Sequence, residues 1–157
     1  MTRVSALFEG GGFKSRVLDD IRSEIWLKLW GNLTFNPISA VTHATLVDIC
    51  QFGLTRTLAA TMMTEAQAIA ERLGATFRVP MERRIAGAEG VGKHKTSMLQ
   101  DVEAGKPLEI DGMLGVVVEL AEMTDVDVPT LRALYACVSL LNKTIQDEGV
   151  RIKAEPK

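Results

Sequence analysis

The chain has 157 residues, of which 46% are hydrophobic and 24% are charged, and its net charge is −2. This length is enough for one domain with one sizeable core and leaves no room for a second full domain. The small net charge gives no broad positive field, so we expect neither nucleic acid nor an anionic membrane surface as a partner. No export signal and no apolar run of membrane-spanning length are present, so we expect a cytoplasmic protein.

The first predicted helix runs from about Asp19 to Phe35. Two aspartates at its start can accept the free N–H groups of a first turn, and apolar residues recur every four positions after them. Pro37 disfavours helical backbone at the residue before it, so we expect the helix to end or kink there. The chain is then expected to continue irregularly from Ile38 to Thr45.

The clearest helical pattern follows from about Leu54 to Leu73, where apolar residues recur every three or four positions. Gly74 comes directly after it and is typical of a helix C-terminus. Pro80 suits the first turn of a shorter helix that extends through Ile85. Three closely spaced glycines after this helix predict a flexible stretch.

A short helix is predicted for residues 97–104, because Ser97 and Gln100 have the spacing of a capping box. Another helix is expected to start near Glu109 and to continue through Leu120. Val116-Val117-Val118 could also form a strand, but the surrounding residues contain no turn signal, which favours a helix.

The last helix is expected to begin near Pro129 and to carry an apolar stripe from Leu131 to Ile145, and the tail from Gly149 is expected to fray. The chain contains no internal repeat. These patterns predict an all-α fold in which residues 1–157 form a single helical domain with a core at about residues 12–148. Cys50 and Cys137 match no metal-ligand spacing and are expected to be free thiols.

The most informative polar pattern is Lys28, Asn32 and Asn36. Their spacing of four residues places an amine and two amides along one face of the first helix. A lysine among apolar neighbours loses hydration when charged, so its pKa should fall and its proton should be easier to donate. The simpler interpretation is that Lys28 extends to water, that Asn32 is a surface residue and that Asn36 caps the helix before the proline.

Ser97 and Glu109 are further candidates, each with an ordinary structural alternative. The Ser97 hydroxyl could cap its helix or, with the free N–H groups there, bind a carboxylate, and the basic run of residues 93–95 could add positive charge. Glu109 follows a turn that contains a proline, where the helix dipole stabilises a carboxylate. The spacing of the other polar residues singles out no catalytic pair or metal site, so the following are expected to be structural: His43, Asp48 and Glu65.

Two long motifs resemble the C-terminal domain of ketopantoate reductases. The first is the run DIRSEIWLKLWGNLTFNP at residues 20–37, and the second is SMLQDVEAGKPLEID at residues 97–111. Val128-Pro129-Thr130 before the last helix also fits the family. The resemblance covers residues 12–146, and both motifs occur in the family's order.

The resemblance implies an oxidoreductase that reduces 2-dehydropantoate to pantoate, a step of pantothenate biosynthesis, with hydride from NADPH. By motif position, Lys28 is the general acid, Asn32 and Asn36 orient the substrate, Ser97 holds its carboxylate end, and Glu109 completes the polar network. The family's active site lies between this helical domain and an N-terminal Rossmann domain. The segment GGGFKS at residues 10–15 lacks the G-x-G-x-x-G spacing, so we expect no Rossmann domain and no bound NADP in this chain.

Three functions are therefore weighed. The first is the substrate-binding and acid-donating half of a 2-dehydropantoate 2-reductase, inactive alone, whose substrate is a small 2-oxo acid. The second is a non-catalytic protein that associates with itself through apolar surface, which would include a homodimer. The third is a module that binds a small 2-oxo or 2-hydroxy acid without reducing it.

Overall fold

The computed structural model describes residues 1–149, and every regular element within them is helical. The bounds of the elements are α1 Thr2–Gly10, α2 Ile21–Thr42, α3 Leu46–Gln51, α4 Gly53–Arg72, α5 Met81–Gly90, α6 Ser97–Ala104, the π-helical turn η1 Asp111–Gly115, α7 Val116–Thr124 and α8 Pro129–Glu148. The all-α prediction is confirmed. Residues 116–118 begin α7, so the helical interpretation of this run is also confirmed.

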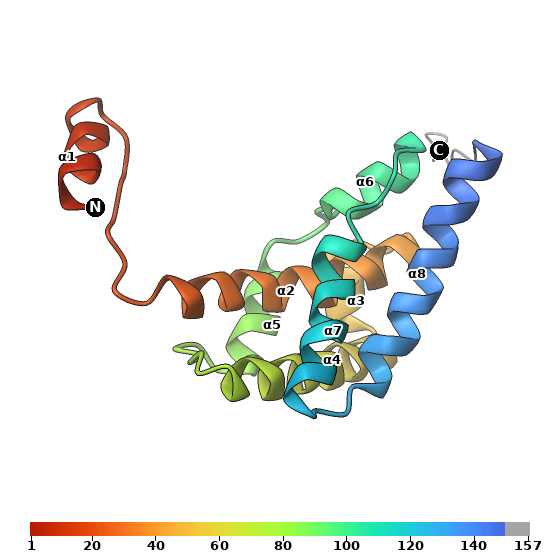
Figure 1. The fold of residues 1–157 in the computed structure, drawn as a ribbon. Helices are drawn as coiled ribbons and strands as arrows, with labels where there is room; N and C mark the ends of the chain where they lie inside the picture. Colours follow the sequence, from red (N-terminus) through yellow and green to blue (C-terminus); the bar gives the residue numbers. More distant parts are fainter. Residues whose placement is uncertain (150–157) are drawn as a thin grey trace.

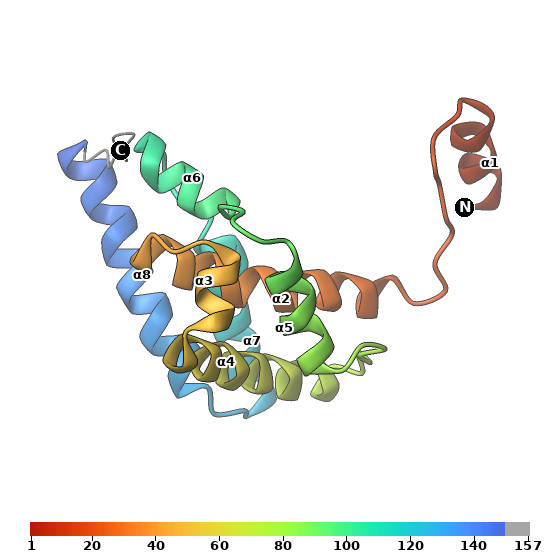
Figure 2. The same ribbon diagram turned by 180° about the vertical axis from the view of Figure 1, so that it is seen from behind.

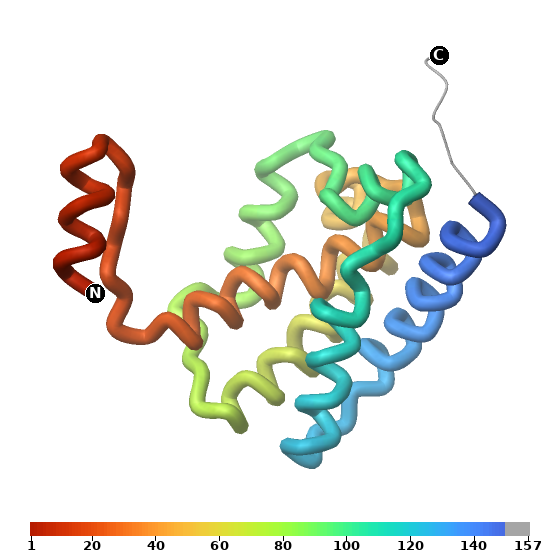
Figure 3. The backbone as a smooth tube through the Cα atoms, turned by 45° about the horizontal axis from the view of Figure 1, so that its top comes forward, coloured from red at the N-terminus to blue at the C-terminus, as the bar shows by residue number. Residues whose placement is uncertain are grey.

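Helix α2 is the central element, and α3, α4, α6, α8 and η1 all pack against it (Figure 1). The view from behind shows α3 and α5 side by side on the other face of the molecule (Figure 2). Helix α1 stands apart from this body and is joined to α2 by an extended segment (Figure 3). None of the residues of α1 is buried. The core therefore lies around α2, between α4 on one side and α6 and α8 on the others.

The expectations that the helix ends at Pro37 and that the chain is irregular from Ile38 are wrong, whereas a kink at Pro37 stays a prediction. The helix begins after Asp20, whose side chain accepts the backbone N–H of Ser23 at 3.1 Å, and it continues to Thr42. A proline inside a helix removes one backbone hydrogen bond. Every residue from Leu33 to Ala40 is buried, and the packing on all sides of this stretch holds the helical path through the proline.

Two helices were not expected from the sequence. Helix α3 falls in the part of the chain between the first two predicted helices, where Thr45 and Asp48 form a reciprocal capping box at its start. Helix α1 precedes the glycine run. Helix α5 also extends beyond Ile85 to Gly90, so the stretch expected to be flexible after Ile85 is partly helical.

The predicted patterns of α4 and α8 are confirmed as core-facing stripes. Met62, Ala66 and Ile69 of α4 are fully buried, and Leu131 and Val138 of α8 are fully buried opposite them. The two helices are also joined by a specific cap, which is described below. Gly74 has φ +82° after α4, as expected for the residue that ends a helix there.

Among the described residues, no helix is both long enough and apolar enough to cross a membrane. Residues 150–157, which make up most of the tail expected to fray, lie outside the described part of the chain. Cys50 is buried and Cys137 is exposed, and neither is in a disulfide.

Candidate functional site

The polar face of α2 runs from solvent into the core. Lys28 is exposed, Asn32 is half-buried, and Asn36 is 7% exposed, so the three side chains lie at increasing depth along one face. The helix places them one turn apart. Such an arrangement can hold a small molecule with its reacting end near the amine and the rest of it against the amides.

The expected apolar surroundings of Lys28 are not formed by this chain. Ile21 and Ile25 are 55% and 57% exposed, so they do not cover the lysine. A charged amine loses its hydration only where other groups cover it and exclude water. Any surface that covers Lys28 must therefore come from outside the described residues.

Asn32, Asn36 and Ser97 line one pocket of about 330 Å³, formed between α2, α5 and the start of α6. A pocket of this size can accept a small organic acid. Three of the five predicted site residues are thus brought together, although they lie up to 65 positions apart in the sequence.

Ser97 is not the helix cap, which corrects the predicted capping box. Thr96 precedes α6 as its cap, and its hydroxyl accepts the backbone N–H of Leu99 at 3.2 Å. Ser97 is exposed and occupies the first helical position. Because capping does not use the Ser97 hydroxyl, this group can face a ligand in the pocket.

The basic run before α6 contributes less free charge than the sequence suggests. Lys95 lies 2.6 Å from a carboxylate oxygen of Glu103, so its charge is paired. His94 lines the same pocket as Ser97. Lys93 is exposed, as expected for a solvated residue.

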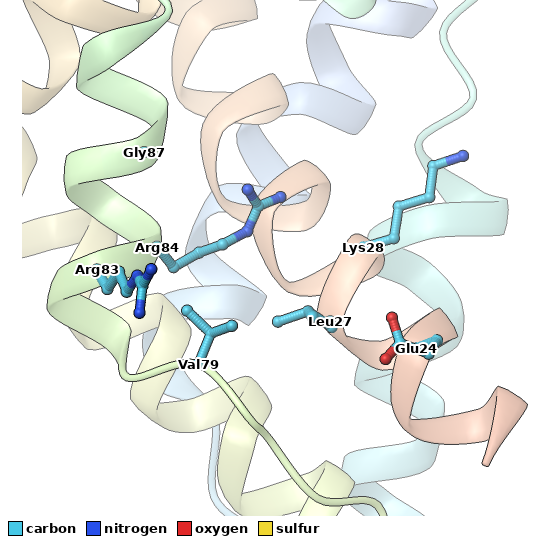
Figure 4. A pocket seen from close by; sticks show the side chains of 7 residues that line it. All are labelled: Glu24, Leu27, Lys28, Val79, Arg83, Arg84 and Gly87. Carbon is cyan, nitrogen blue, oxygen red and sulfur yellow. The ribbon is translucent and has the colours of Figure 1, made fainter. Parts of the chain in front are cut away.

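Lys28 lines a second, adjoining pocket of about 380 Å³ between α2 and α5 (Figure 4). The two pockets share Arg84 and Gly87 on α5. Glu24 also lines the second pocket, and it forms an ion pair with Arg78 at 2.6 Å. This pairing lowers the pKa of the Glu24 carboxyl, mainly through the hydrogen bond from Arg78.

Glu109 is exposed and lines neither pocket. It was expected at the start of a helix, but the π-helical turn begins two residues later, at Asp111. Its carboxylate is therefore not brought beside Lys28 within either pocket.

The three residues expected to be structural do have structural roles. Glu65 accepts the backbone N–H groups of Thr130 and Leu131 at 3.0 and 2.9 Å, and so caps α8. Asp48 caps α3, and its hydrogen bonds with Thr45 lower the pKa of its carboxyl. His43 has φ 57° and ends α2.

The sequence reasoning missed Arg84, which reaches from α5 toward α2 between the two pockets (Figure 4). Its guanidinium lies against Gly31, where a Cβ atom would come within 2.3 Å of a guanidinium nitrogen. Gly31 is in the interior of a helix, where glycine costs about 1 kcal/mol relative to alanine. An isolated glycine in a helical pattern is the signal that could have indicated a close approach at this point.

The described residues contain no group of three or more His, Cys, Asp or Glu side chains that could hold a metal ion. The chemistry that this site can perform rests on amines, guanidinium, amides and hydroxyls. Such groups bind anions and carbonyl oxygens and can donate a proton to them.

Comparison with known proteins gives consistent matches. The family model described as "Ketopantoate reductase PanE/ApbA C terminal" matches residues 20–142. A 2-dehydropantoate 2-reductase from Mesorhizobium japonicum is 56% identical over 130 residues, covering 83% of this chain and 40% of the relative. A 2-dehydropantoate 2-reductase from Pyrobaculum aerophilum is 32% identical over 136 residues, covering 86% of this chain and 49% of the relative.

Solved structures agree with these matches. The crystal structure of 2-dehydropantoate 2-reductase from Methylococcus capsulatus superposes with a TM-score of 0.82 at 29% identity, covering 93% of this chain and 51% of that one. The chain thus spans about half the length of the relatives that it matches. The sequence matches and the shared helical fold together place this chain in the family of ketopantoate reductase C-terminal domains.

Proposed function

We propose that this chain is the substrate-binding and general-acid half of an NADPH-dependent 2-dehydropantoate 2-reductase. The observation that carries the proposal is the polar face of α2, whose Lys28, Asn32 and Asn36 line two adjoining pockets in a chain of this family. In this proposal the residues form one helical substrate-binding domain, and a Rossmann domain completes the enzyme.

Lys28 is the proposed general acid. When hydride adds to the ketone carbon of ketopantoate, negative charge develops on the ketone oxygen, and the Lys28 ammonium donates the proton that turns it into the hydroxyl of pantoate. The exposure of Lys28 in this chain fits a side chain that a second domain covers.

Asn32 and Asn36 are proposed to orient the substrate, since each amide can donate to and accept from its oxygens. Ser97 is proposed to hold the carboxylate end from the other wall of the pocket. Glu109 is proposed to complete the polar network around the hydroxyl. Its role rests on the resemblance alone, since it lines neither pocket.

The cofactor of the proposed enzyme is NADPH, which supplies the hydride. The described residues contain no strand and therefore no Rossmann unit, so their helices do not provide the glycine-rich turn that cradles a dinucleotide. We propose that the companion Rossmann domain binds NADPH and that this chain alone does not turn over.

The test is NADPH oxidation with ketopantoate, measured on this chain and on the same chain joined to the N-terminal part of the Mesorhizobium japonicum relative. We expect turnover from the joined protein and none from the chain alone. Both proteins are purified from a strain that lacks its own ketopantoate reductase, so that a contaminating host enzyme cannot account for the turnover. If the joined protein is folded and does not reduce ketopantoate, the proposed function is wrong.

Self-association is the second candidate, and exposed apolar side chains at the N-terminal end favour it. The most exposed of these are Met1 at 94%, Leu7 at 73% and Phe13 at 68%. Apolar surface of this kind usually marks a protein interface. Light scattering of the purified chain tests it, and a strict monomer contradicts self-association.

If the chain instead binds pantoate but the joined protein never reduces ketopantoate, it is a binding module.

A further inference from the structure

The side chain of Arg84 has no partner of its own among the described residues. Its Nε is buried and makes no hydrogen bond, and the guanidinium forms no ion pair. A buried N–H group without a partner is destabilising, so native proteins seldom leave one unless a ligand or water satisfies it.

Glu24, the acidic residue that lines a pocket with Arg84, does not neutralise the charge of Arg84. Glu24 lines the pocket that Lys28, Arg83 and Arg84 also line, but its carboxylate is held by Arg78 through two hydrogen bonds of 2.6 and 3.0 Å. The pocket therefore has an excess of positive charge in a chain whose net charge is −2. Such a pocket suits an anion.

Gly31 allows Arg84 to reach this place. With any larger residue at position 31, the Cβ atom would collide with the guanidinium, which lies against the backbone of α2 at Gly31. Pro80 and the first turn of α5 fix the base of the arginine, whose backbone N–H donates to the Pro80 carbonyl at 3.1 Å. The arginine is thus anchored on α5, and its guanidinium reaches α2 at Gly31.

We propose that Arg84 binds the carboxylate of the 2-oxo acid together with Ser97, which lines the same pocket, an inference that rests on the proposed function. In a 2-oxo acid the carboxylate is bonded to the ketone carbon. The group that binds the carboxylate must therefore adjoin the group that protonates the ketone oxygen. Arg84 lines one pocket with Lys28 and the other with Ser97. The exposed Lys28 side chain points away from Arg84 in Figure 4, so it must turn toward the guanidinium to protonate the ketone oxygen. A guanidinium can also bind a carboxylate through two parallel hydrogen bonds.

The experiment is a titration of the 157-residue chain with pantoate and with its neutral amide, followed by the NMR shifts of backbone amides. We expect Arg84→Gln to weaken pantoate binding by about 10- to 100-fold, the range for a charge-assisted hydrogen bond. Arg84→Lys should recover only part of the affinity, because the amine lacks the two-pronged geometry. The neutral amide should bind wild type about as weakly as pantoate binds Arg84→Gln.

Two further variants separate binding from folding. Arg72→Gln removes the same charge from an exposed position of α4 that lines neither pocket, and it should leave pantoate binding unchanged. Gly31→Ala should weaken pantoate binding by displacing the guanidinium, while the midpoint of unfolding stays equal or rises, because alanine is the better helix former.

The inference is overturned if wild type binds no pantoate, if it binds pantoate and the amide equally, or if Arg84→Gln binds pantoate as wild type does. If the joined protein reduces ketopantoate but Arg84→Gln binds pantoate as wild type does, the role of Arg84 is refuted and the proposed function stands. If pantoate binding depends on Arg84 but the joined protein does not reduce ketopantoate, the proposed function is refuted and the role of Arg84 in binding stands.

Discussion

The two halves of α2 have different surroundings. From Trp30 to Ala40 the helix is buried on nearly every side, with Asn32 as the one half-buried residue. Before Trp30 the same helix exposes Ile21, Ile25 and Lys28. A stretch of helix that is buried on nearly every side belongs to the core, whereas exposed apolar residues beside an amine indicate a face that another surface covers. The half from Trp30 onward thus holds the fold together and also carries the amides of Asn32 and Asn36, whereas the other half exposes the amine of Lys28.

The largest expected effect comes from the buried half. Trp30 is fully buried, its Nε1 donates to the Met63 carbonyl at 2.7 Å, and its ring lies 4.4 Å from that of Phe77. Trp30→Ala should lower the free energy of unfolding by about 3–5 kcal/mol. Urea denaturation measures this loss. A loss below about 1 kcal/mol would mean that the buried half does not hold the core.

The next effect tests how firmly α8 is held against α4, the helix that packs beside the buried half of α2. Glu65 on α4 accepts two backbone N–H groups at the start of α8. Glu65→Ala should lower the free energy of unfolding by about 1–2 kcal/mol, as expected for the loss of a helix cap. Glu65→Gln is the matched variant, since its amide oxygen can still accept one of the bonds. Equal losses from both variants would contradict a capping role.

A smaller effect is expected at the exposed half, where Arg78 lowers the pKa of Glu24. A carboxyl whose pKa is lower in the folded state stabilises the fold above its ordinary value of 4.5, and this contribution disappears as the pH falls through the folded value. Wild type should therefore unfold at a higher urea concentration than Glu24→Gln at pH 7, and the difference should vanish in acid. Glu82→Gln, at an exposed position, controls for the lost charge.

The smallest effect is expected at Ile25, which is 57% exposed. Ile25→Ala should change the free energy of unfolding of this chain by no more than about 0.5 kcal/mol, because little apolar area is withdrawn from water here. Parallel urea titrations of wild type and variant measure the difference. A loss comparable to that of Trp30→Ala would remove the contrast between the two halves.

Elements with a long apolar period could be predicted from the sequence, as α4 and α8 show. Helix α3 could not, because six residues are too few to display a period, and its capping box at Thr45 and Asp48 was the only signal. Pro37 misled the prediction of α2, since the local preference of a proline yields to burial on all sides.

The candidate site was predictable only where its residues share one helix. Lys28, Asn32 and Asn36 are four positions apart, so their common face follows from helical geometry. Arg84 comes from α5, and only tertiary packing brings it to this face. For Ser97, the prediction placed the cap one residue too late, because Thr96 and Ser97 are both good capping residues and sequence alone does not choose between them.

The measurement that tests the account most directly is the turnover of Lys28→Ala in the chain joined to a Rossmann domain, with urea denaturation of the same sample. If Lys28 is the acid, kcat should fall by roughly 10²- to 10⁴-fold with no change in the unfolding midpoint. Arg22→Ala, another exposed cation of α2 that lines neither pocket, should retain full turnover. Full turnover by Lys28→Ala would contradict the account, because the exposed half of α2 would then not supply the proton.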